Sequence, residues 1–333
     1  MLIYIKGIWG YEMEWQQIIG FYQVAKLKSF TRAAEATLRT QSALTQQIKA
    51  LEKEFDCLLL ERIGKRKVIV TPIGERFFKF AGSLLIGYNQ LREDIAEHRE
   101  FKKGHLRIAA PFTTFYHLLP LIIREYHKKF PWVELSLIDR PQKEVVDLVK
   151  IGDVDIGMAL ESSVTSALRK RRWKMMEPGL LVPAGHPLSG RKKISVAEIA
   201  QTPLILPPER SDAFQRSNLE TLFRKHNVRY SVIMESSNIE LSSLYVEMGL
   251  GVSFASLVKD LAPLQKRKLS FISLRHILPV EHLCIIMRKD KKMTVYQNSF
   301  LDLLFFAHSK KGFNKKAKAR LIVKGNKRDG SLS

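Results

Sequence analysis

Residues 104–307 alternate between short apolar strand patterns and amphipathic helix patterns, and this alternation constrains the fold more than any other feature. Strand patterns are found at 106–110, 133–138, 155–160, 179–183, 203–207, 230–234, 251–255 and 282–287. Helix patterns are found between or after them at 118–130, 142–150, 214–226, 239–248 and 295–307. Such alternation predicts an α/β architecture with a largely parallel sheet covered by helices.

The first 100 residues predict a different, all-α-rich part. Helix patterns cover, in order, 16–27, 32–38 and 41–55. Ser29 or Thr31 is expected to cap the second helix and Thr40 the third, because a short side-chain oxygen can accept a free N–H of the first turn. Leu38 and Leu44 are expected to pack near the turn between these two helices. This spacing is that of a helix-turn-helix.

The helix expected over 41–55 has two contrasting faces. Its apolar face is formed by Leu44, Ile48, Leu51 and Phe55. Its polar stripe is formed by Gln41, Ser42, Thr45, Gln46 and Lys49. Gln can bond both edge groups of an adenine, and Ser or Thr can bond a base or a phosphate. The stripe therefore suits a helix in the major groove, although a merely solvated helix face has the same spacing.

A basic hairpin and a long helix are expected next. Gly64 permits a tight turn, the β-branched run 68–70 favours a strand, and Pro72 is expected to end it. The helix expected over 74–101 has apolar residues at spacings of 4, 3, 4, 3 and 4, namely Phe77, Ala81, Leu84, Tyr88, Leu91 and Ile95. This heptad seam predicts pairing with a second copy, and packing on its own domain is the alternative.

The charge balance favours a polyanionic partner. The chain has 55 Lys and Arg against 33 Asp and Glu, a formal net charge of +22. Nucleic acid is the first candidate, an anionic membrane surface the second, and a generally basic protein the neutral interpretation. Nine Lys and Arg lie in 309–333, which is expected to be a disordered tail. That tail could add non-specific DNA affinity or only improve solubility.

Motifs for catalysis or metal binding are missing from the sequence. Cys57 and Cys284 are the only cysteines, and they form no CxxC pair. No GxSxG, HExxH, P-loop or GxGxxG motif occurs, and the nine His are scattered, so we expect neither an enzyme nor a cofactor or metal site. No apolar run reaches the ~18–20 residues that a membrane span needs. Residues 1–12 lack the features of a secretory signal, which favours a cytoplasmic protein.

Four segments of the first 76 residues resemble the LysR-type transcriptional regulators: SFTRAAEA, TQSALTQQIKALEKEF, LLLER and VIVTPIGE. The resemblance continues more loosely through FPWVEL, GDVDIGMA and VEMGLGVS. The family's usual start coincides with Met13, so residues 1–12 are either a leader or the product of a mis-called start codon. The chain departs from the family at five positions: Asp56 replaces Gly, Leu60 replaces Phe, Ser42 replaces Pro, Thr45 replaces Ser and Gln46 replaces Arg.

The resemblance implies a division into domains. A winged helix-turn-helix is implied for 13–73, a linker helix for 74–103 and an effector-binding domain for 104–307, followed by the basic tail 308–333. The effector-binding domain would resemble periplasmic solute-binding proteins. Its first subdomain would comprise 104–161 with 276–307, and its second would comprise 162–275.

The resemblance also implies roles for particular residues. Base edges would be read by Gln41, Ser42, Thr45 and Gln46, with the departure at Gln46 changing base preference. Phosphates would be held by Thr31, Arg32, Lys49, Arg62, Lys65, Arg66 and Lys67. Ligands of such folds sit at strand carboxyl ends and helix N-termini, which here selects Thr113, Thr114, Ser162, Ser211, Ser237 and Asn238. Simple helix capping is the alternative role for this last group.

The function expected from these features is a sequence-specific transcriptional regulator switched by a small-molecule effector. Its expected partners are double-stranded DNA, the effector, further copies in a homodimer or homotetramer, and RNA polymerase. A solute-binding protein and a ligand-independent architectural DNA-binding protein are the alternatives. The N-terminal motif argues against the first, and about 200 residues of α/β domain argue against the second.

Overall fold

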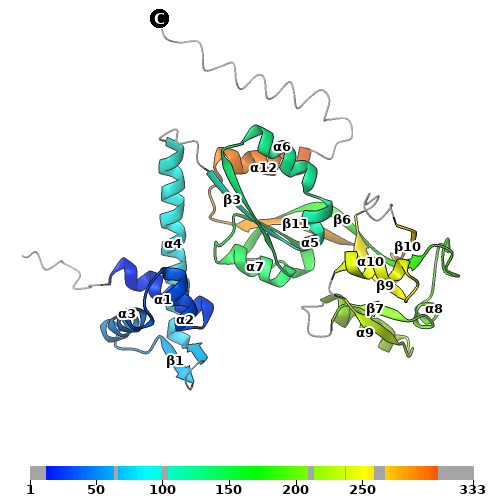
Figure 1. The fold of residues 1–333 in the computed structure, drawn as a ribbon, viewed down its shortest axis with the longest axis horizontal. Coiled ribbons are helices and arrows are strands. Elements are labelled where there is room, and N and C mark those ends of the chain that lie inside the picture. The colour runs from blue at the N-terminus through cyan, green and yellow to red at the C-terminus, as the bar shows by residue number, and fades with distance from the viewer. Residues whose placement is uncertain are drawn as a thin grey trace, which may run out of the picture. The chain divides into compact units, whose positions relative to one another are not determined.

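The computed structural model describes residues 13–63, 67–98, 104–208, 214–236, 238–258 and 267–306. The chain divides into two compact units, Met1–Arg99 and Glu100–Ser333 (Figure 1). No helix within the described residues is both long and apolar enough to cross a membrane.

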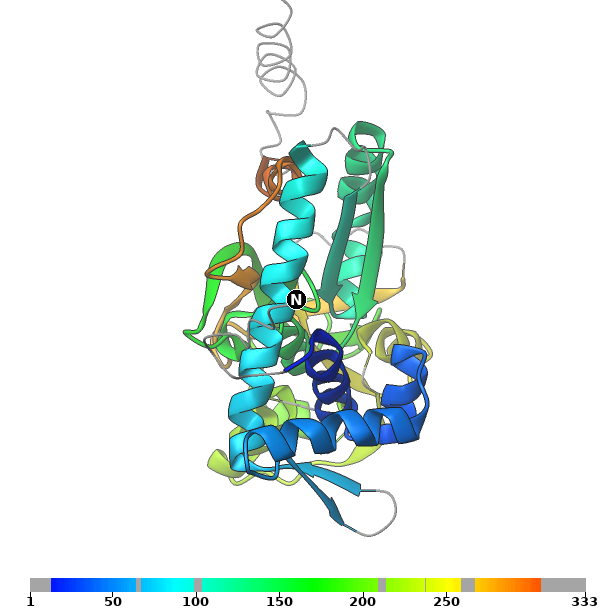
Figure 2. The same ribbon diagram turned by 90° about the vertical axis from the view of Figure 1, so that its left-hand side faces the viewer.

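The first unit contains four helices and a two-stranded hairpin among its described residues. The helices are α1 (Trp15–Leu27), α2 (Phe30–Thr37), α3 (Gln41–Glu54) and α4 (Pro72–His98). The antiparallel hairpin consists of β1 (Leu60–Ile63) and β2 (Lys67–Val70). Figure 2 shows α3 and the hairpin together at the N-terminal end of α4.

Local capping and small residues explain how α2 and α3 cross. The Ser29 side chain accepts the backbone N–H of Arg32, and the Thr40 side chain accepts that of Ala43, so both expected caps are confirmed. Ala33 is fully buried, which lets the helix backbones approach closely. Leu44 is also fully buried, as expected, within a core that includes Phe21 and Leu51.

One local expectation was wrong. Leu38 does not pack near the turn, because it is 95% exposed and ends α2 with a left-handed backbone, φ 53°. The strand before Pro72 ends as expected, at Val70, and Pro72 is itself the first residue of α4. Proline suits a first helical turn because its missing N–H would be unpaired there anyway. The Thr71 hydroxyl accepts the N–H of Gly74, 2.9 Å away, and so caps the helix.

The second unit is built on a sheet that continues from one lobe to another. The strand order is β4-β3-β5-β11-β6-β9-β7-β8, with β10 also pairing with β6. The bounds are β3 (Gly104–Ala110), β4 (Val133–Asp139), β5 (Ile156–Leu160), β6 (Leu168–Pro183), β7 (Leu204–Leu206), β8 (Val232–Glu235), β9 (Val252–Leu257), β10 (Leu269–Ser273) and β11 (Glu281–Arg288). We call the part around β3, β4, β5 and β11 the first lobe, and the part around β7, β8, β9 and β10 the second lobe.

The sheet is mixed rather than largely parallel as expected. Within each lobe the expected parallel pairs are present, β3 with β4 and β5, and β7 with β8 and β9. The strands β6 and β11 run antiparallel to their neighbours. The reason is that β6 belongs to both lobes: it pairs with β11 through residues 168–176 and with β9 and β10 through 177–183.

Helices cover the sheet in both lobes (Figure 1). The first lobe carries α5 (Phe112–His117), α6 (Pro120–Lys129), α7 (Gln142–Lys150), the short 3-10 turn η1 (Glu161–Ser163) and α12 (Val295–Phe306). The second carries α8 (Val196–Ala200), α9 (Phe214–Lys225) and α10 (Ile239–Glu247). Each lobe has its own core: Tyr126 and Phe300 are fully buried in the first, and Phe223 is fully buried in the second.

Four segments were not predicted from the sequence: α5, α8, β10 and the first half of β6. The first half of β6 contains the run Arg169–Arg172, whose four side chains are all exposed. A strand of this kind has no apolar residue at every second position, so the periodicity that identifies strands is lost. The two missed helices are only six and five residues long, too short for a helical period to be recognised.

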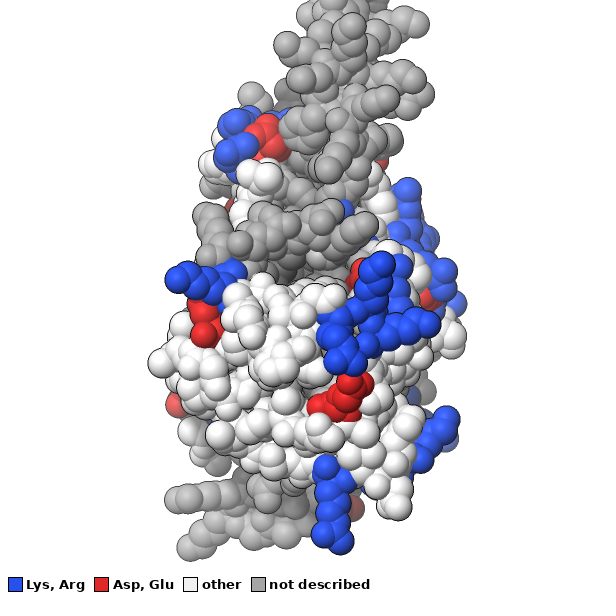
Figure 3. Space-filling model, turned by 90° about the vertical axis from the view of Figure 1, so that its right-hand side faces the viewer, with Lys and Arg blue, Asp and Glu red and all other residues white. Residues whose placement is uncertain are grey.

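Basic side chains are not restricted to the first unit. Figure 3 looks onto the right-hand end of Figure 1, and Lys and Arg are prominent on the face that it shows. This agrees with the net charge of +22 for the whole chain.

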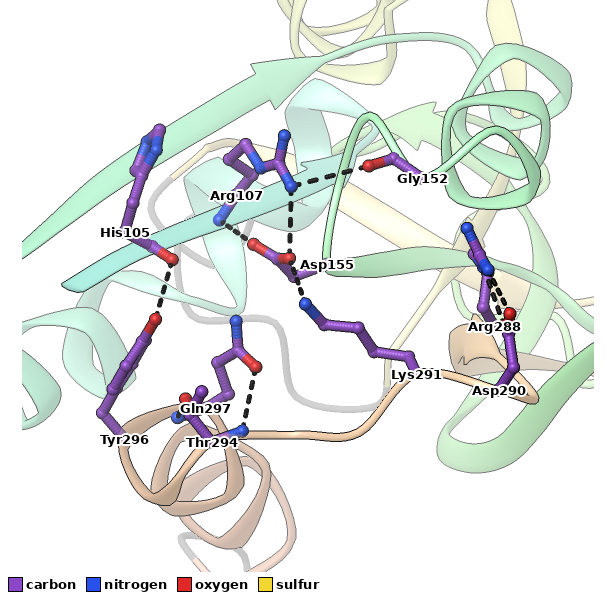
Figure 4. Close-up of polar contacts among 10 residues, drawn as sticks. All are labelled: His105, Arg107, Gly152, Asp155, Arg288, Asp290, Lys291, Thr294, Tyr296 and Gln297. Atoms are coloured by element: carbon purple, nitrogen blue, oxygen red, sulfur yellow. Dashed lines mark hydrogen bonds and ion pairs between the residues drawn. The ribbon is translucent and has the colours of Figure 1, made fainter. Parts of the chain in front are cut away.

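Asp155 joins three distant segments of the first lobe (Figure 4). Its carboxylate accepts the backbone N–H of Arg107 at 2.8 Å and lies 3.4 Å from the guanidinium of the same residue. The Nζ atom of Lys291, in the segment before α12, lies 3.1 Å away. Only 2% of the Asp155 side chain is exposed, so its charge is compensated by these two cations rather than by water.

Candidate nucleic-acid interface and ligand-binding region

The polar stripe of α3 lies on the surface of the first unit. Gln41, Ser42, Gln46 and Lys49 are exposed and Thr45 is partly exposed. The opposite face buries Leu44, Ile48 and Leu51, whereas Phe55 is 40% exposed at the end of the helix. The Thr45 hydroxyl donates to the Gln41 carbonyl at 2.9 Å. The helix thus exposes two glutamine amides, a serine hydroxyl and a lysine.

The candidate phosphate-binding residues lie beside this stripe or in the hairpin. Thr31 and Arg32 are exposed on α2, and the Arg32 guanidinium donates to the carbonyl of Leu27 at 2.5 Å. Arg62 stands opposite Val68 in β1, and Lys67 begins β2. Lys65 and Arg66 lie outside the described residues.

Glu52 fixes the hairpin relative to α3, a role that sequence reasoning did not identify. Its Oε1 atom accepts the backbone N–H groups of Leu59 and Leu60 at 2.9 and 3.1 Å. The Thr71 hydroxyl secures the other strand by donating to the carbonyl of Leu58 at 2.7 Å. The sequence contains no direct signal for the Glu52 contacts, because they join residues seven and eight positions apart across a turn.

The heptad positions of α4 divide into two groups. Ala81 is fully buried beside Ile18 and Tyr22, and the Phe77 ring lies 4.9 Å from that of Phe21, so these two pack within their own unit. The remaining four are exposed by 36–55%, namely Leu84, Tyr88, Leu91 and Ile95. The apolar seam that stays available to a partner is therefore the C-terminal part of the helix.

Several candidate ligand-binding residues follow the carboxyl ends of parallel strands. Thr113 and Thr114 follow β3, and Ser162 follows the adjacent β5, so these three belong to one edge of the first lobe. Asn238 follows β8 in the second lobe. Thr114 is buried, whereas Thr113 is partly exposed. Ser211 and Ser237 lie outside the described residues.

Two of these side chains already have protein partners. The Ser162 hydroxyl donates to Oε2 of Glu281 at 2.9 Å. The Asn238 side chain accepts the backbone N–H of Glu240 at 2.8 Å and caps α10. The capping role that the sequence left open for Asn238 is therefore present.

One contact joins the two lobes near these residues. Nε2 of His117, on α5, lies 2.6 Å from Oε1 of Glu240, on α10, and only 2% of the His117 side chain is exposed. No sequence pattern selects either residue, because α5 and α10 are brought together only by the fold. The other carboxylate oxygen of Glu240 lies 3.6 Å from Arg267.

Neighbouring carboxylates are held in the charged form. The pKa of Glu247 is lowered by the backbone N–H of Lys268 and by the Arg267 guanidinium. The pKa of Glu161, which begins the turn containing Ser162, is lowered by Arg172 and Lys170. The region around the two lobes' strand ends thus contains several fixed charges of both signs.

Family models match nearly the whole described chain. Residues 15–75 match the bacterial regulatory helix-turn-helix of the lysR family, and residues 99–305 match the LysR substrate binding domain. The HTH-type transcriptional activator CmpR of Synechocystis is 30% identical over 299 residues, covering 86% of this chain and 92% of the relative. The chain belongs to the LysR family of transcriptional regulators.

Other relatives agree with this assignment. The HTH-type transcriptional regulator CysL of Bacillus subtilis is 30% identical over 266 residues, covering 76% of this chain and 88% of the relative. A full-length OxyR structure from Pseudomonas aeruginosa has a TM-score of 0.63 at 22% identity, covering 88% of this chain and 96% of that one. This structural likeness concerns the fold.

Membership of the LysR family determines the class of function. The protein is a DNA-binding transcriptional regulator with an effector-binding domain, and it is not an enzyme. Its architecture is that of the family: an N-terminal helical DNA-binding part, the long helix α4 and an α/β effector-binding part.

Proposed function

We propose that this LysR-type regulator reads base edges with Gln41, Ser42, Thr45 and Gln46. The observation that carries the proposal is the polar stripe of α3, which is exposed along the helix while the opposite face is buried. A glutamine amide can pair with both the N6 and N7 groups of adenine. Gln46, at the centre of the stripe, is the residue most able to set base preference.

Phosphate contacts would come from the residues around this stripe. Thr31 and Arg32 of α2 and Lys49 of the stripe itself would contribute, and the hairpin would add Arg62, Lys65, Arg66 and Lys67. Such contacts fix the register of a protein on DNA and supply affinity that falls with salt. The Glu52 contacts support the proposal for the hairpin, because they hold its first strand at a defined position relative to α3.

The effector is proposed to bind between the two lobes of residues 104–307. The residues proposed to contact it are Thr113, Thr114, Ser162, Ser211, Ser237 and Asn238. Support comes from the position of the four described residues directly after the carboxyl ends of β3, β5 and β8, where ligands of α/β sheets bind. The hydroxyl and amide groups suit a small polar ligand.

The proposed working form is a homodimer or a homotetramer in the cytoplasm. The exposed apolar residues Leu84, Tyr88, Leu91 and Ile95 support pairing through α4. Pairing would place two recognition helices on neighbouring half-sites. Contact with RNA polymerase is part of the same proposal.

The base-reading role is tested by selecting bound genomic fragments and then measuring affinity for the selected duplex and for a random one. In Gln46→Ala the difference in binding free energy between the selected and the random duplex should fall by about 1–3 kcal/mol, because one bidentate base contact is removed. Lys49→Ala is the matched control on the same helix face. It should weaken binding to both duplexes by the same factor. The slope of log affinity against log salt concentration should become shallower by about 1.

Equal losses on the two duplexes for Gln46→Ala would refute its base-reading role. If the unmodified protein bound both duplexes equally, the proposed reading function of α3 would be wrong as a whole.

A further inference from the structure

Leu38 has an unusual combination of exposure and backbone strain. The residue is 95% exposed, and its φ and ψ angles are 53° and 46°. In this left-handed region the Cβ atom approaches the carbonyl oxygen, so leucine is disfavoured there. A large apolar residue that is both strained and exposed does not contribute to the stability of the unit.

The backbone conformation is needed, but leucine is not. The left-handed residue ends α2 and allows the N–H of Arg39 to reach the carbonyl of Ala34 at 2.9 Å. Glycine or asparagine is the usual residue at this position of a helix end. The other described non-glycine residues with positive φ are Lys28, Asp56 and Asn227, which are all polar. Leu38 is therefore the exception, and local folding does not explain it.

The position of Leu38 suggests what the side chain does. It lies three residues before Gln41, at the N-terminal end of the polar stripe, and Thr40, Gln41 and Ser42 beside it are all exposed. Among the groups that base pairs present in the major groove, the thymine 5-methyl group is the apolar one. Strain retained at a binding surface is a common sign of function.

We propose that Leu38 is a further specificity-determining residue, and that it contacts a thymine methyl group at the edge of the site read by α3. This inference rests on the proposed base-reading function of α3. It adds an apolar contact to a surface whose other candidate residues are polar.

The test uses the full chain and the selected duplex, with each thymine replaced in turn by deoxyuridine, which lacks only the methyl group. At one position the replacement should weaken binding by about fourfold, the equivalent of one methyl-sized group removed from an apolar contact. Leu38→Asn should weaken binding to the thymine duplex by a similar factor and should be insensitive to that replacement. Its melting temperature should be equal or higher, because asparagine tolerates the left-handed conformation.

Lys28→Asn is the matched control, because Lys28 ends α1 with the same left-handed conformation, φ 49°. Its binding should respond to deoxyuridine as the unmodified protein does. Leu38→Gly provides a second variant in which the backbone is relaxed and the side chain is absent.

The inference is overturned if every deoxyuridine effect persists unchanged in both Leu38 variants, or if neither variant loses affinity for the selected duplex. A protein that cannot distinguish the selected from the random duplex would instead disprove the base-reading function, and this inference with it.

Discussion

Asp155 shows how one side chain can hold together parts of a domain that are far apart in the sequence. The carboxylate contacts Arg107 at the centre of β3 and Lys291 in the segment that leads into α12. With 2% of its side chain exposed, it cannot exchange these partners for water. Removing the Asp155 carboxylate would take this partner from Lys291, whose side chain is only 12% exposed. The loss would lower the stability of the domain.

We expect Asp155→Ala to lower the free energy of unfolding by about 2 kcal/mol, less than for a fully buried pair because Arg107 is partly exposed. Urea denaturation would measure this. Asp147→Ala is the control, because Asp147 pairs with Lys150 at 3.4 Å on the surface of α7. It should change the free energy by less than about 0.5 kcal/mol, and equal effects for the two variants would contradict the role given to Asp155.

Helix α4 differs in its burial along its length. Its first turns complete the core of the first unit through Phe77 and Ala81, and its later turns expose Leu84, Tyr88, Leu91 and Ile95. The heptad spacing alone could not separate these groups, because the same apolar periodicity serves a core and a partner helix.

Leu91→Asp should convert the proposed dimer to a monomer at micromolar concentration, because a charge would be buried in the apolar seam. Sedimentation velocity would measure the change, and DNA affinity should fall with it. Asn89→Asp adds the same charge at an exposed position off the seam and should leave the oligomeric state unchanged. A Leu91→Asp variant that sedimented like the unmodified protein would exclude pairing through this part of α4.

Across the effector-binding part of the molecule, the contact between His117 and Glu240 joins the two lobes directly. Nε2 of His117 lies 2.6 Å from Oε1 of Glu240, and only 2% of the His117 side chain is exposed. Neither atom has a partner in hydrogen-bond geometry among the described residues, so the contact is close but poorly aligned.

His117→Ala and Glu240→Ala should each speed amide hydrogen exchange in α5 and α10 by about tenfold. The double variant should add little to Glu240→Ala, which already removes the contact with His117 together with the one to Arg267. Exchange in the core strands β3 and β7 should not change. His105→Ala is the control, because the His105 side chain bonds to Ser136 within the first lobe, 2.7 Å away. Slower exchange, or additive effects in the double variant, would show that the pair does not hold the lobes together.

Much of the fold was predictable from the sequence because periodicity and capping are local properties. Helix α7 has the bounds Gln142–Lys150 that its apolar spacing predicts, and the caps Ser29 and Thr40 are the expected residues. The exposed stripe of α3 follows from the same spacing. The resemblance to the LysR family came from ordered motifs in the first 76 residues and was confirmed by the family match.

Where the sequence was misleading, a local pattern had more than one tertiary outcome. Leu38 is apolar, but the chain reversal at the end of α2 leaves it exposed, whereas Leu44, six residues later, is fully buried. The charged run 169–172 forms part of strand β6 only because β11 provides its hydrogen-bonding partner. No local pattern connects Glu52 with Leu59, Asp155 with Lys291, or His117 with Glu240. The sequence alone thus determined most helices and strands through amphipathic spacing, and the family through its ordered motifs. Contacts between distant residues decided how the hairpin and the two lobes are held, because such contacts exist only once the chain is packed.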